Sequence, residues 1–238
     1  MTASPSNTGA SAGVKIPRHH RLILIRHAQS AVDPQRPPAE WGLTREGKDA
    51  ARRLAALGLL DRAMGFYAGP EPKMIQSLEP AVIDRRHTVQ ADAAFAETHS
   101  EGFLGNDQFL AAVQRVFTAP DEPPAPRWET ATAACARFAA GVDRLRQVHE
   151  PDRNGDRVVP GTVVICTGGR MLISYLAAVL DWSAAEAMAH WRALKMPDLA
   201  VLELDEQPED AQRPNGVRGW GEGVGKGDLV IPFGTLVI

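Results

Sequence analysis

Two basic side chains, Arg26 and His27, directly follow the short apolar run at residues 22–25 in the segment RLILIRHAQS. A continuous apolar run of this length is typical of a strand that is buried on both faces of a sheet. A strand that ends on Arg-His places both side chains at the rim of that sheet, where open α/β folds bind their ligands. The pair therefore predicts a cationic ligand site at the end of the first strand.

A second buried strand, expected at residues 162–166 (TVVIC), runs directly into Thr167, two glycines and Arg170. Thr167 suits the cap position of the following helix, and such a cap presents backbone N–H groups to an anion. We expect Arg26 and Thr167 to converge, because strand ends gather at one edge of this architecture. Arg170 is expected on the flank of the helix, and Cys166 as a small buried residue.

Strands alternate with helices along most of the chain. The pattern predicts strands at residues 21–25, 63–69, 162–166 and 199–205, with a strand-like segment at 228–238. It predicts helices at residues 43–60, 70–86, 107–117, 129–149, 171–180 and 183–194. Thr44 is expected to cap the first helix, and Pro80 to kink or end the second. This alternation predicts an α/β fold with a mainly parallel central sheet and helices on both faces.

The length and composition of the chain limit its organisation and its partners. Residues 1–20 are small and polar and predict a disordered tail, and residues 21–238 are expected to form a single domain. A net charge of −3 without long basic runs argues against nucleic-acid binding. No apolar stretch approaches the ~20 residues that cross a bilayer, so no membrane partner is expected. Two distant cysteines fit a reducing compartment, and we expect a cytoplasmic protein.

The ordered series of motifs resembles the histidine phosphatase superfamily, which includes the phosphoglycerate mutases. The segment LILIRHAQS resembles the superfamily's strand followed by Arg-His-Gly, and LTREG resembles the Leu-Thr-x-x-Gly that opens its next helix. The segments FYAGPEPKMIQSL, FAE with GFLG, WETATAACARF and TVVICTGGRML then follow in the family's order. Together these matches cover most of residues 21–204, so the resemblance implies a phosphoglycerate mutase-like fold.

The resemblance also implies a reaction, in which a small phosphorylated metabolite is hydrolysed through a phosphohistidine at His27. Mapped by motif, Arg26 would clamp the phosphate, and Glu97 would protonate the leaving oxygen. Further phosphate contacts would come from three side chains, namely Ser30, Lys73 and Thr167. The phosphohistidine route needs no cofactor or metal, and the sequence holds no convincing ligand cluster for one. The oligomeric state is not readable from the sequence.

Several positions depart from the superfamily's pattern. Lys73 stands at its second arginine and lacks the planar bidentate fork. Thr167 stands at its second histidine and offers one hydroxyl donor. Ala28 replaces the glycine after the nucleophile, and the carboxylate of Asp33, aligned with an asparagine, would repel a phosphate unless protonated or paired. Because one lost donor costs about 10²–10³ in rate, we expect a degenerate pocket with weak activity.

Two functions stay open on the sequence alone. The first is a weak phosphomonoesterase, supported by the retained Arg26, His27 and Glu97. The second is a non-catalytic or repurposed member that binds an anionic ligand or a partner, supported by the departures. If the natural protein hydrolyses a metabolite efficiently, His99 or Arg170 is expected to supply the missing contact. A mutase ranks third, since return of phosphate to the substrate needs a well-organised cationic pocket.

Overall fold

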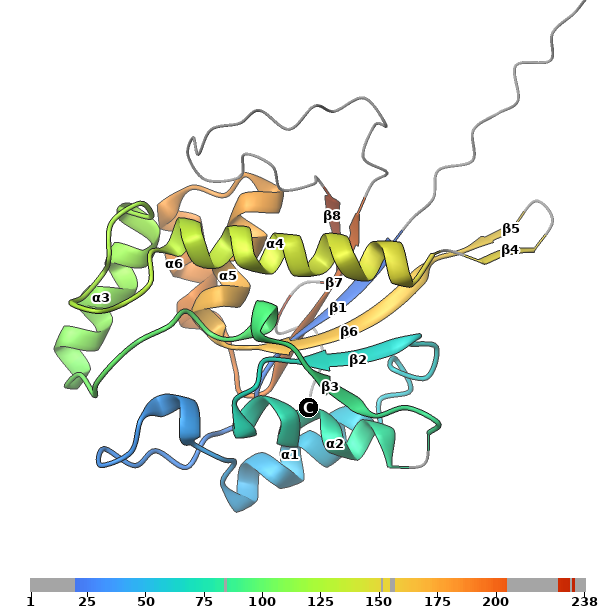
Figure 1. The fold of residues 1–238 in the computed structure, drawn as a ribbon, viewed down its shortest axis with the longest axis horizontal. Coiled ribbons are helices and arrows are strands. Elements are labelled where there is room, and N and C mark those ends of the chain that lie inside the picture. The colour runs from blue at the N-terminus through green and yellow to red at the C-terminus, as the bar shows by residue number, and fades with distance from the viewer. Residues whose placement is uncertain are drawn as a thin grey trace, which may run out of the picture.

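The computed structural model describes residues 20–83, 85–150, 152–154, 157–204, 227–231 and 233. A six-stranded sheet with the strand order β3-β2-β6-β1-β7-β8 forms the centre, and helices pack on both of its faces (Figure 1). The predicted tail lies outside the described residues except for His20, which belongs to the first strand. Within the described residues, no helix combines the length and the apolar character that a membrane span requires.

The strands are β1 (His20–Arg26), β2 (Gly65–Ala68), β3 (Val89–Ala91), β4 (Asp152–Asn154), β5 (Arg157–Val159), β6 (Gly161–Thr167), β7 (Asp198–Leu204) and β8 (Gly227–Ile231). The α-helices are α1 (Arg45–Ala55), α2 (Pro72–Val82), α3 (Asn106–Thr118), α4 (Ala131–Val148), α5 (Gly169–Leu180) and α6 (Ala184–Ala193). Two short 3-10 helices are η1 (Pro38–Glu40) and η2 (Ala93–Phe95). The predicted α/β alternation is confirmed.

The sheet is mainly parallel, as the alternation predicts, and becomes antiparallel toward one edge. β6 runs parallel to β1 and β2, and β3 runs parallel to β2. β7 runs antiparallel to both β1 and β8. The reversal at β7 follows from the two helices between β6 and β7, because α5 carries the chain away from the carboxyl edge of the sheet and α6 brings it back.

The apolar run of β1 is buried on both faces, as its composition predicts. Successive strand residues point to opposite faces of a sheet. Leu22 and Leu24 accordingly join one core cluster with α4 and α5, whereas Ile23 and Ile25 join another with α1 and α2. Figure 1 shows these two helix pairs on opposite sides of the sheet. β1 is therefore the strand that both layers share.

The elements of the structure differ from the sequence expectations in three places. The segment at 151–161, in which the sequence analysis predicts no strand or helix, contains the hairpin of β4 and β5. Strand β3 and the helix η2 were not predicted. Helix α2 continues through Pro80 to Val82, so this proline does not end it. Of the strand-like segment at 228–238, residues beyond 231 lie outside the described residues apart from residue 233.

Candidate active site

His27 lies at the carboxyl edge of the sheet, and neighbouring elements hold its backbone. Its N–H donates to the Thr167 carbonyl at 3.1 Å, which joins the ends of β1 and β6. The next N–H, of Ala28, donates to the Ser77 hydroxyl at 2.9 Å. That hydroxyl donates to the Lys73 carbonyl at 2.7 Å, within α2. Ser77 therefore couples α2 to the loop after β1, a positioning role that the sequence analysis missed.

The imidazole of His27 is buried and has a defined tautomer. Its Nδ1 lies 2.7 Å from the Ala28 carbonyl oxygen. A carbonyl can only accept, so Nδ1 carries the proton and Nε2 keeps its lone pair. Burial lowers the pKa of His27 to about 4, and the charges of Lys73 and Arg26 act in the same direction. The ring is therefore neutral at pH 7. The Ser30 hydroxyl, a predicted phosphate ligand, lies 3.5 Å from Nδ1.

Arg26 and Lys73, the two predicted cations, both donate to backbone carbonyls. Nη1 of Arg26 lies 2.9 Å from the Leu194 oxygen, and Nζ of Lys73 lies 2.6 Å from the Pro38 oxygen. Burial lowers the pKa of both groups, while the negative charge of Glu97 opposes the shift. Within the described residues, the buried Nε of Arg26 has no hydrogen-bond partner. One N–H of Arg26 is therefore uncommitted.

The Glu97 carboxylate lies at the N-terminus of α5. Its Oε1 accepts from the N–H groups of Thr98 and Met171, each at 2.8 Å, and its Oε2 accepts from the Arg170 N–H at 3.2 Å. Burial alone raises the pKa of Glu97, but the Arg170 guanidinium and these N–H donors outweigh burial and hold the pKa below its ordinary value. A Cβ at Gly168 would overlap this carboxylate, so the glycine makes room for it. The predicted role of Glu97 as proton donor stays a prediction, and the geometry favours its ionised form.

Thr167, at the end of β6, turns its hydroxyl away from a prospective anion. The side chain is fully buried, and its hydroxyl donates to the Phe95 carbonyl at 2.7 Å. Its one proton is therefore committed, and its role in phosphate binding stays a prediction. The expectation that Thr167 caps α5 is wrong, because Gly168 holds the cap position.

Arg170 lies within the site, whereas the sequence placed it on the flank of α5. It is 6% exposed, and its guanidinium carbon lies 4.5 Å from the ring centroid of Trp128. Nη2 donates to the Thr98 carbonyl at 3.2 Å, and the buried Nη1 has no hydrogen-bond partner among the described residues. The sequence pattern conceals this arrangement because α5 is buried on nearly every side, so no face marks the polar residue.

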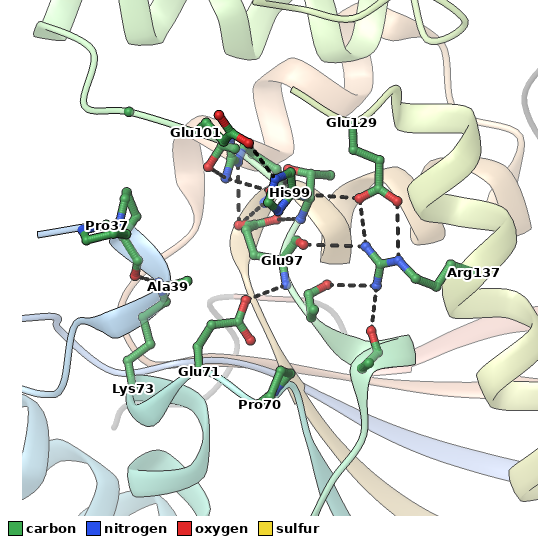
Figure 2. Close-up of a pocket in the computed structure, with 17 residues that line it drawn as sticks. Pro37, Ala39, Pro70, Glu71, Lys73, Glu97, His99, Glu101, Glu129 and Arg137 are labelled. Atoms are coloured by element: carbon green, nitrogen blue, oxygen red, sulfur yellow. Dashed lines mark hydrogen bonds and ion pairs between the residues drawn. The ribbon is translucent and has the colours of Figure 1, made fainter. Parts of the chain in front are cut away.

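A cavity of about 780 Å³ opens beside these groups (Figure 2). Four parts of the chain line it. These are residues 37–39, the start of α2 with Pro70, Glu71 and Lys73, residues 93 and 96–102, and the side chains of Glu129, Arg137 and Arg170. The sequence-predicted residues are thus divided, since Lys73 and Glu97 line the cavity but Arg26, His27, Ser30 and Thr167 do not. His27 meets solvent only through its 8% exposed surface. His99 lines the cavity, and Asp33 lies apart in its loop, where it accepts from the Gln35 N–H.

Glu71 is a site residue that the sequence analysis missed. It is 7% exposed, lines the cavity and accepts the Glu97 N–H on Oε1 at 2.9 Å. Its Oε2 is buried without a hydrogen-bond partner in the described structure, and burial raises the pKa of the carboxyl. One signal could have revealed it. Glu71 stands between two prolines directly after a predicted strand, at the edge where the other site residues gather.

Arg137, on α4, fixes the segment that carries Glu97. Its Nη1 donates to the carbonyls of Ala93 and Ala94, each at 2.9 Å. Its Nη2 donates to the Glu129 carboxylate at 2.8 Å. Figure 2 shows this network on the side of the cavity opposite Lys73. Arg137 therefore supports the site, with its guanidinium already engaged by the protein.

The geometry defines an α/β protein with a neutral, buried histidine among cationic side chains at the carboxyl edge of its sheet. Within the described parts of the chain, no group of three or more histidine, cysteine, aspartate or glutamate residues is placed to hold a metal ion. The model of the histidine phosphatase superfamily (branch 1) matches residues 22–215. This chain belongs to that superfamily, and the resemblance in its motifs is confirmed.

Solved structures with the same fold include three bacterial proteins. Mycobacterial hydrolase 2 is 19% identical with a TM-score of 0.67, and the match covers 90% of each chain. Mycobacterial glucosyl-3-phosphoglycerate phosphatase is 18% identical with a TM-score of 0.63, covering 90% of this chain and 98% of that one. Bacillus stearothermophilus YhfR is 18% identical with a TM-score of 0.62, covering 89% and 96%. No curated protein matches the chain. At these identities the likeness shows the fold alone.

Proposed function

We propose that this protein is a phosphomonoesterase that hydrolyses a small phosphorylated metabolite through a phosphohistidine at His27. The observation that carries the proposal is the state of the ring. Nδ1 is committed to the Ala28 carbonyl, and burial lowers the pKa of His27 to about 4. A nitrogen nucleophile must be unprotonated, and Nε2 meets this requirement at neutral pH. The phosphatase activity named for a structural neighbour supports the same reaction class.

In this proposal the cations around His27 stabilise the transferred phosphoryl group. Nε2 attacks phosphorus, the ester oxygen leaves, and water then releases inorganic phosphate from the histidine. Arg26 contributes its positive charge to the field at the developing charge, while its Nε–H is buried without a partner among the described residues. Lys73 contributes its charge, and one of its three N–H groups is engaged by the Pro38 carbonyl. The Ser30 hydroxyl lies 3.5 Å from Nδ1 of the ring, and its contact with the phosphoryl group on Nε2 is part of the proposal.

The activity is expected to be weak. The one hydroxyl proton of Thr167 points at the Phe95 carbonyl, so it is not preorganised for phosphate, and one N–H of Lys73 is held by the Pro38 carbonyl. Each missing donor costs about 10²–10³ in rate. We therefore expect kcat well below the ~10 s⁻¹ of a typical enzyme. These same committed donors favour the second candidate, a non-catalytic member that binds an anion in the cavity.

The test is hydrolysis of p-nitrophenyl phosphate and a panel of phosphorylated metabolites by the purified protein. His27→Ala should abolish release of phosphate, while the control His87→Ala, at an exposed position, should not. An alkaline quench followed by mass spectrometry should find a phosphoryl group on His27 and nowhere else. Equal rates in natural protein and His27→Ala would contradict the proposal. Binding of phosphate without any turnover would favour the second candidate.

A further inference from the structure

We propose that Arg170 is a positioning residue that keeps Glu97 ionised, and that the protein therefore prefers phosphates whose leaving oxygen departs without a proton. Aryl, enol and acyl phosphates have such leaving groups, whereas alkyl phosphates do not. The inference rests on the proposed phosphatase function, with Glu97 as the proton donor that the resemblance implies, and it names the substrate class of that site. Three features carry it, namely the contacts of the Glu97 carboxylate, the immobilised guanidinium of Arg170, and the place of Glu97 beside the end of β1.

Every polar contact of the Glu97 carboxylate comes from a donor. Oε1 accepts the N–H groups of Thr98 and Met171, each at 2.8 Å, and Oε2 accepts the N–H of Arg170 at 3.2 Å. Nε of the Arg170 side chain lies 3.6 Å from Oε2. The contacts of Arg170 and Met171 come from the first turn of α5, where the helix dipole also favours a negative charge. The geometry therefore stabilises the carboxylate over the neutral acid.

The guanidinium of Arg170 is held in place beside this carboxylate. Its carbon lies 4.5 Å from the ring centroid of Trp128 and 5.8 Å from that of Phe109, and Nη2 donates to the Thr98 carbonyl at 3.2 Å. The side chains of Arg170 and Glu97 are only 7% and 15% exposed, so solvent ions screen the pair little. Both residues line the cavity that Figure 2 shows. The positive charge is therefore part of the folded site and does not depend on a substrate.

The end of β6 brings Glu97 to the proposed nucleophile. The Thr167 carbonyl accepts the His27 N–H at 3.1 Å, and a Cβ on the next residue, Gly168, would overlap the Glu97 carboxylate. The negative charge of Glu97 accordingly opposes the lowering by burial of the pKa of His27 and of Arg26. Glu97 thus lies at the strand ends where the proposed reaction takes place.

The proton occupancy of Glu97 follows from these charges. Burial raises the pKa of Glu97, but the Arg170 guanidinium, the N–H donors and the charge of Lys73 outweigh burial and hold the pKa below its ordinary value of 4.5. Such a carboxyl is protonated in fewer than about one molecule in 300 at pH 7. The other titratable or charged side chains around Glu97 are Arg26 and His27 at the end of β1, Glu71 before α2, and Arg137 on α4.

The proposed reaction balances without a proton from Glu97. The bond between Nε2 of His27 and phosphorus forms, the bond from phosphorus to the leaving oxygen breaks, and the leaving group keeps the electron pair as an anion. Water then gives its oxygen to phosphorus and a proton to the Glu97 carboxylate, the bond to Nε2 breaks, and Glu97 passes the proton to solvent. The products are hydrogen phosphate, the leaving anion and one proton. An alkoxide is too basic to leave in this way, because it needs a proton that ionised Glu97 does not hold.

The experiment compares leaving groups in the full-length protein, with p-nitrophenyl phosphate, acetyl phosphate and glycerol phosphate as probes. The readout is kcat/KM on glycerol phosphate divided by kcat/KM on p-nitrophenyl phosphate. In the natural protein this ratio should fall about tenfold between pH 7 and pH 8, as the protonated fraction of Glu97 does. Acetyl phosphate should follow p-nitrophenyl phosphate.

Two variants of Arg170 assign the effect to its charge. Arg170→Met keeps an apolar side chain against Trp128 and removes the charge. It should raise the ratio about tenfold at pH 7, because an opposite charge at this range commonly lowers a carboxyl pKa by a unit or more. Arg170→Lys should return the ratio toward its natural value, and the control Arg192→Met, at an exposed position on α6, should leave it unchanged. A change of both rates by one common factor in Arg170→Met would overturn the inference, because Arg170 would then act on phosphate binding.

A second measurement follows the carboxyl itself and does not require an Arg170 variant to fold. The infrared difference between the natural protein and Glu97→Gln at pH 7 should contain carboxylate bands and no carbonyl band of a carboxylic acid. A carboxylic acid band in that difference, or a ratio of rates that does not change with pH, would overturn the inference while the proposed function stands. No turnover of any of the three probes would overturn the proposed function, and the inference with it.

Discussion

Burial of His27 serves the proposed chemistry and reduces stability in acid. A ring removed from water stays neutral, which keeps the Nε2 lone pair available to attack phosphorus. The same burial means that the folded protein cannot take up a proton that the unfolded chain accepts readily. This single residue therefore links the pH dependence of stability to the protonation state of the proposed nucleophile.

The first prediction concerns stability between pH 7 and pH 4. Burial lowers the pKa of His27 from 6.5 to about 4 in the folded protein. Between those values the unfolded chain binds a proton that the folded chain does not, so the free energy of unfolding falls as the pH falls. The contribution is about 3 kcal/mol and is fully lost below about pH 4. Urea unfolding across this range measures it, and His27→Gln should show a shallower decline. A decline of the same steepness in the variant would contradict the assignment.

The second prediction separates the structural role of Thr167 from a catalytic one. Thr167→Val keeps the shape of the side chain but leaves the Phe95 carbonyl without its donor in a buried place. We expect a loss of about 1–3 kcal/mol in the free energy of unfolding and little change in hydrolysis. The exposed control Thr88→Val should leave both unchanged. If the folded variant cannot hydrolyse the ester, the hydroxyl acts on the substrate after all.

Periodicity and strand-end chemistry predict elements well and side-chain directions poorly. The run at residues 22–25 predicts a strand buried on both faces because only such a strand is apolar at successive positions. Thr44 predicts the start of α1 because its hydroxyl accepts the Gly47 N–H. By contrast, β3 is three residues long, too short for a periodic pattern. The orientations of Glu71 and Arg170 depend on partners far away in the chain, which local sequence does not specify.

The third prediction tests how α1 positions the loop after β1. A Cβ on Gly47 would overlap the backbone oxygen of Gln29, which lies two residues after His27. A backbone atom cannot move aside as the end of a flexible side chain can. Gly47→Ala should therefore destabilise the protein by about 1–3 kcal/mol despite its better helix propensity, and should reduce hydrolysis by displacing His27. The neighbouring exposed change Lys48→Ala should stay within about 0.5 kcal/mol. An unaffected Gly47→Ala would show that the helix and the loop are not tightly coupled.

Across the whole molecule, the core tolerates many substitutions, whereas the site depends on the identity of particular polar side chains. Neighbours that are 18–19% identical share the fold, because many apolar side chains can fill the layers on either side of the same sheet. The polar edge of the sheet holds the groups that we propose for the activity, among them His27, Lys73 and Thr167. Membership of the superfamily rests on the family model that matches residues 22–215, and activity must be measured at the site.

The last prediction is that the two layers unfold together, as a single domain would. Leu24 and Ile25 are adjacent in β1, fully buried, and face opposite layers, the former toward α4 and α5 and the latter toward α1 and α2. Because β1 also pairs with β6 and β7, neither layer keeps its sheet when β1 is lost. Leu24→Ala and Ile25→Ala should each cost about 2–5 kcal/mol and shift one common transition, with circular dichroism and tryptophan fluorescence giving coincident curves. If Ile25→Ala separated the two curves while Leu24→Ala did not, the α1–α2 layer would be an independent unit and the single-domain prediction would be wrong.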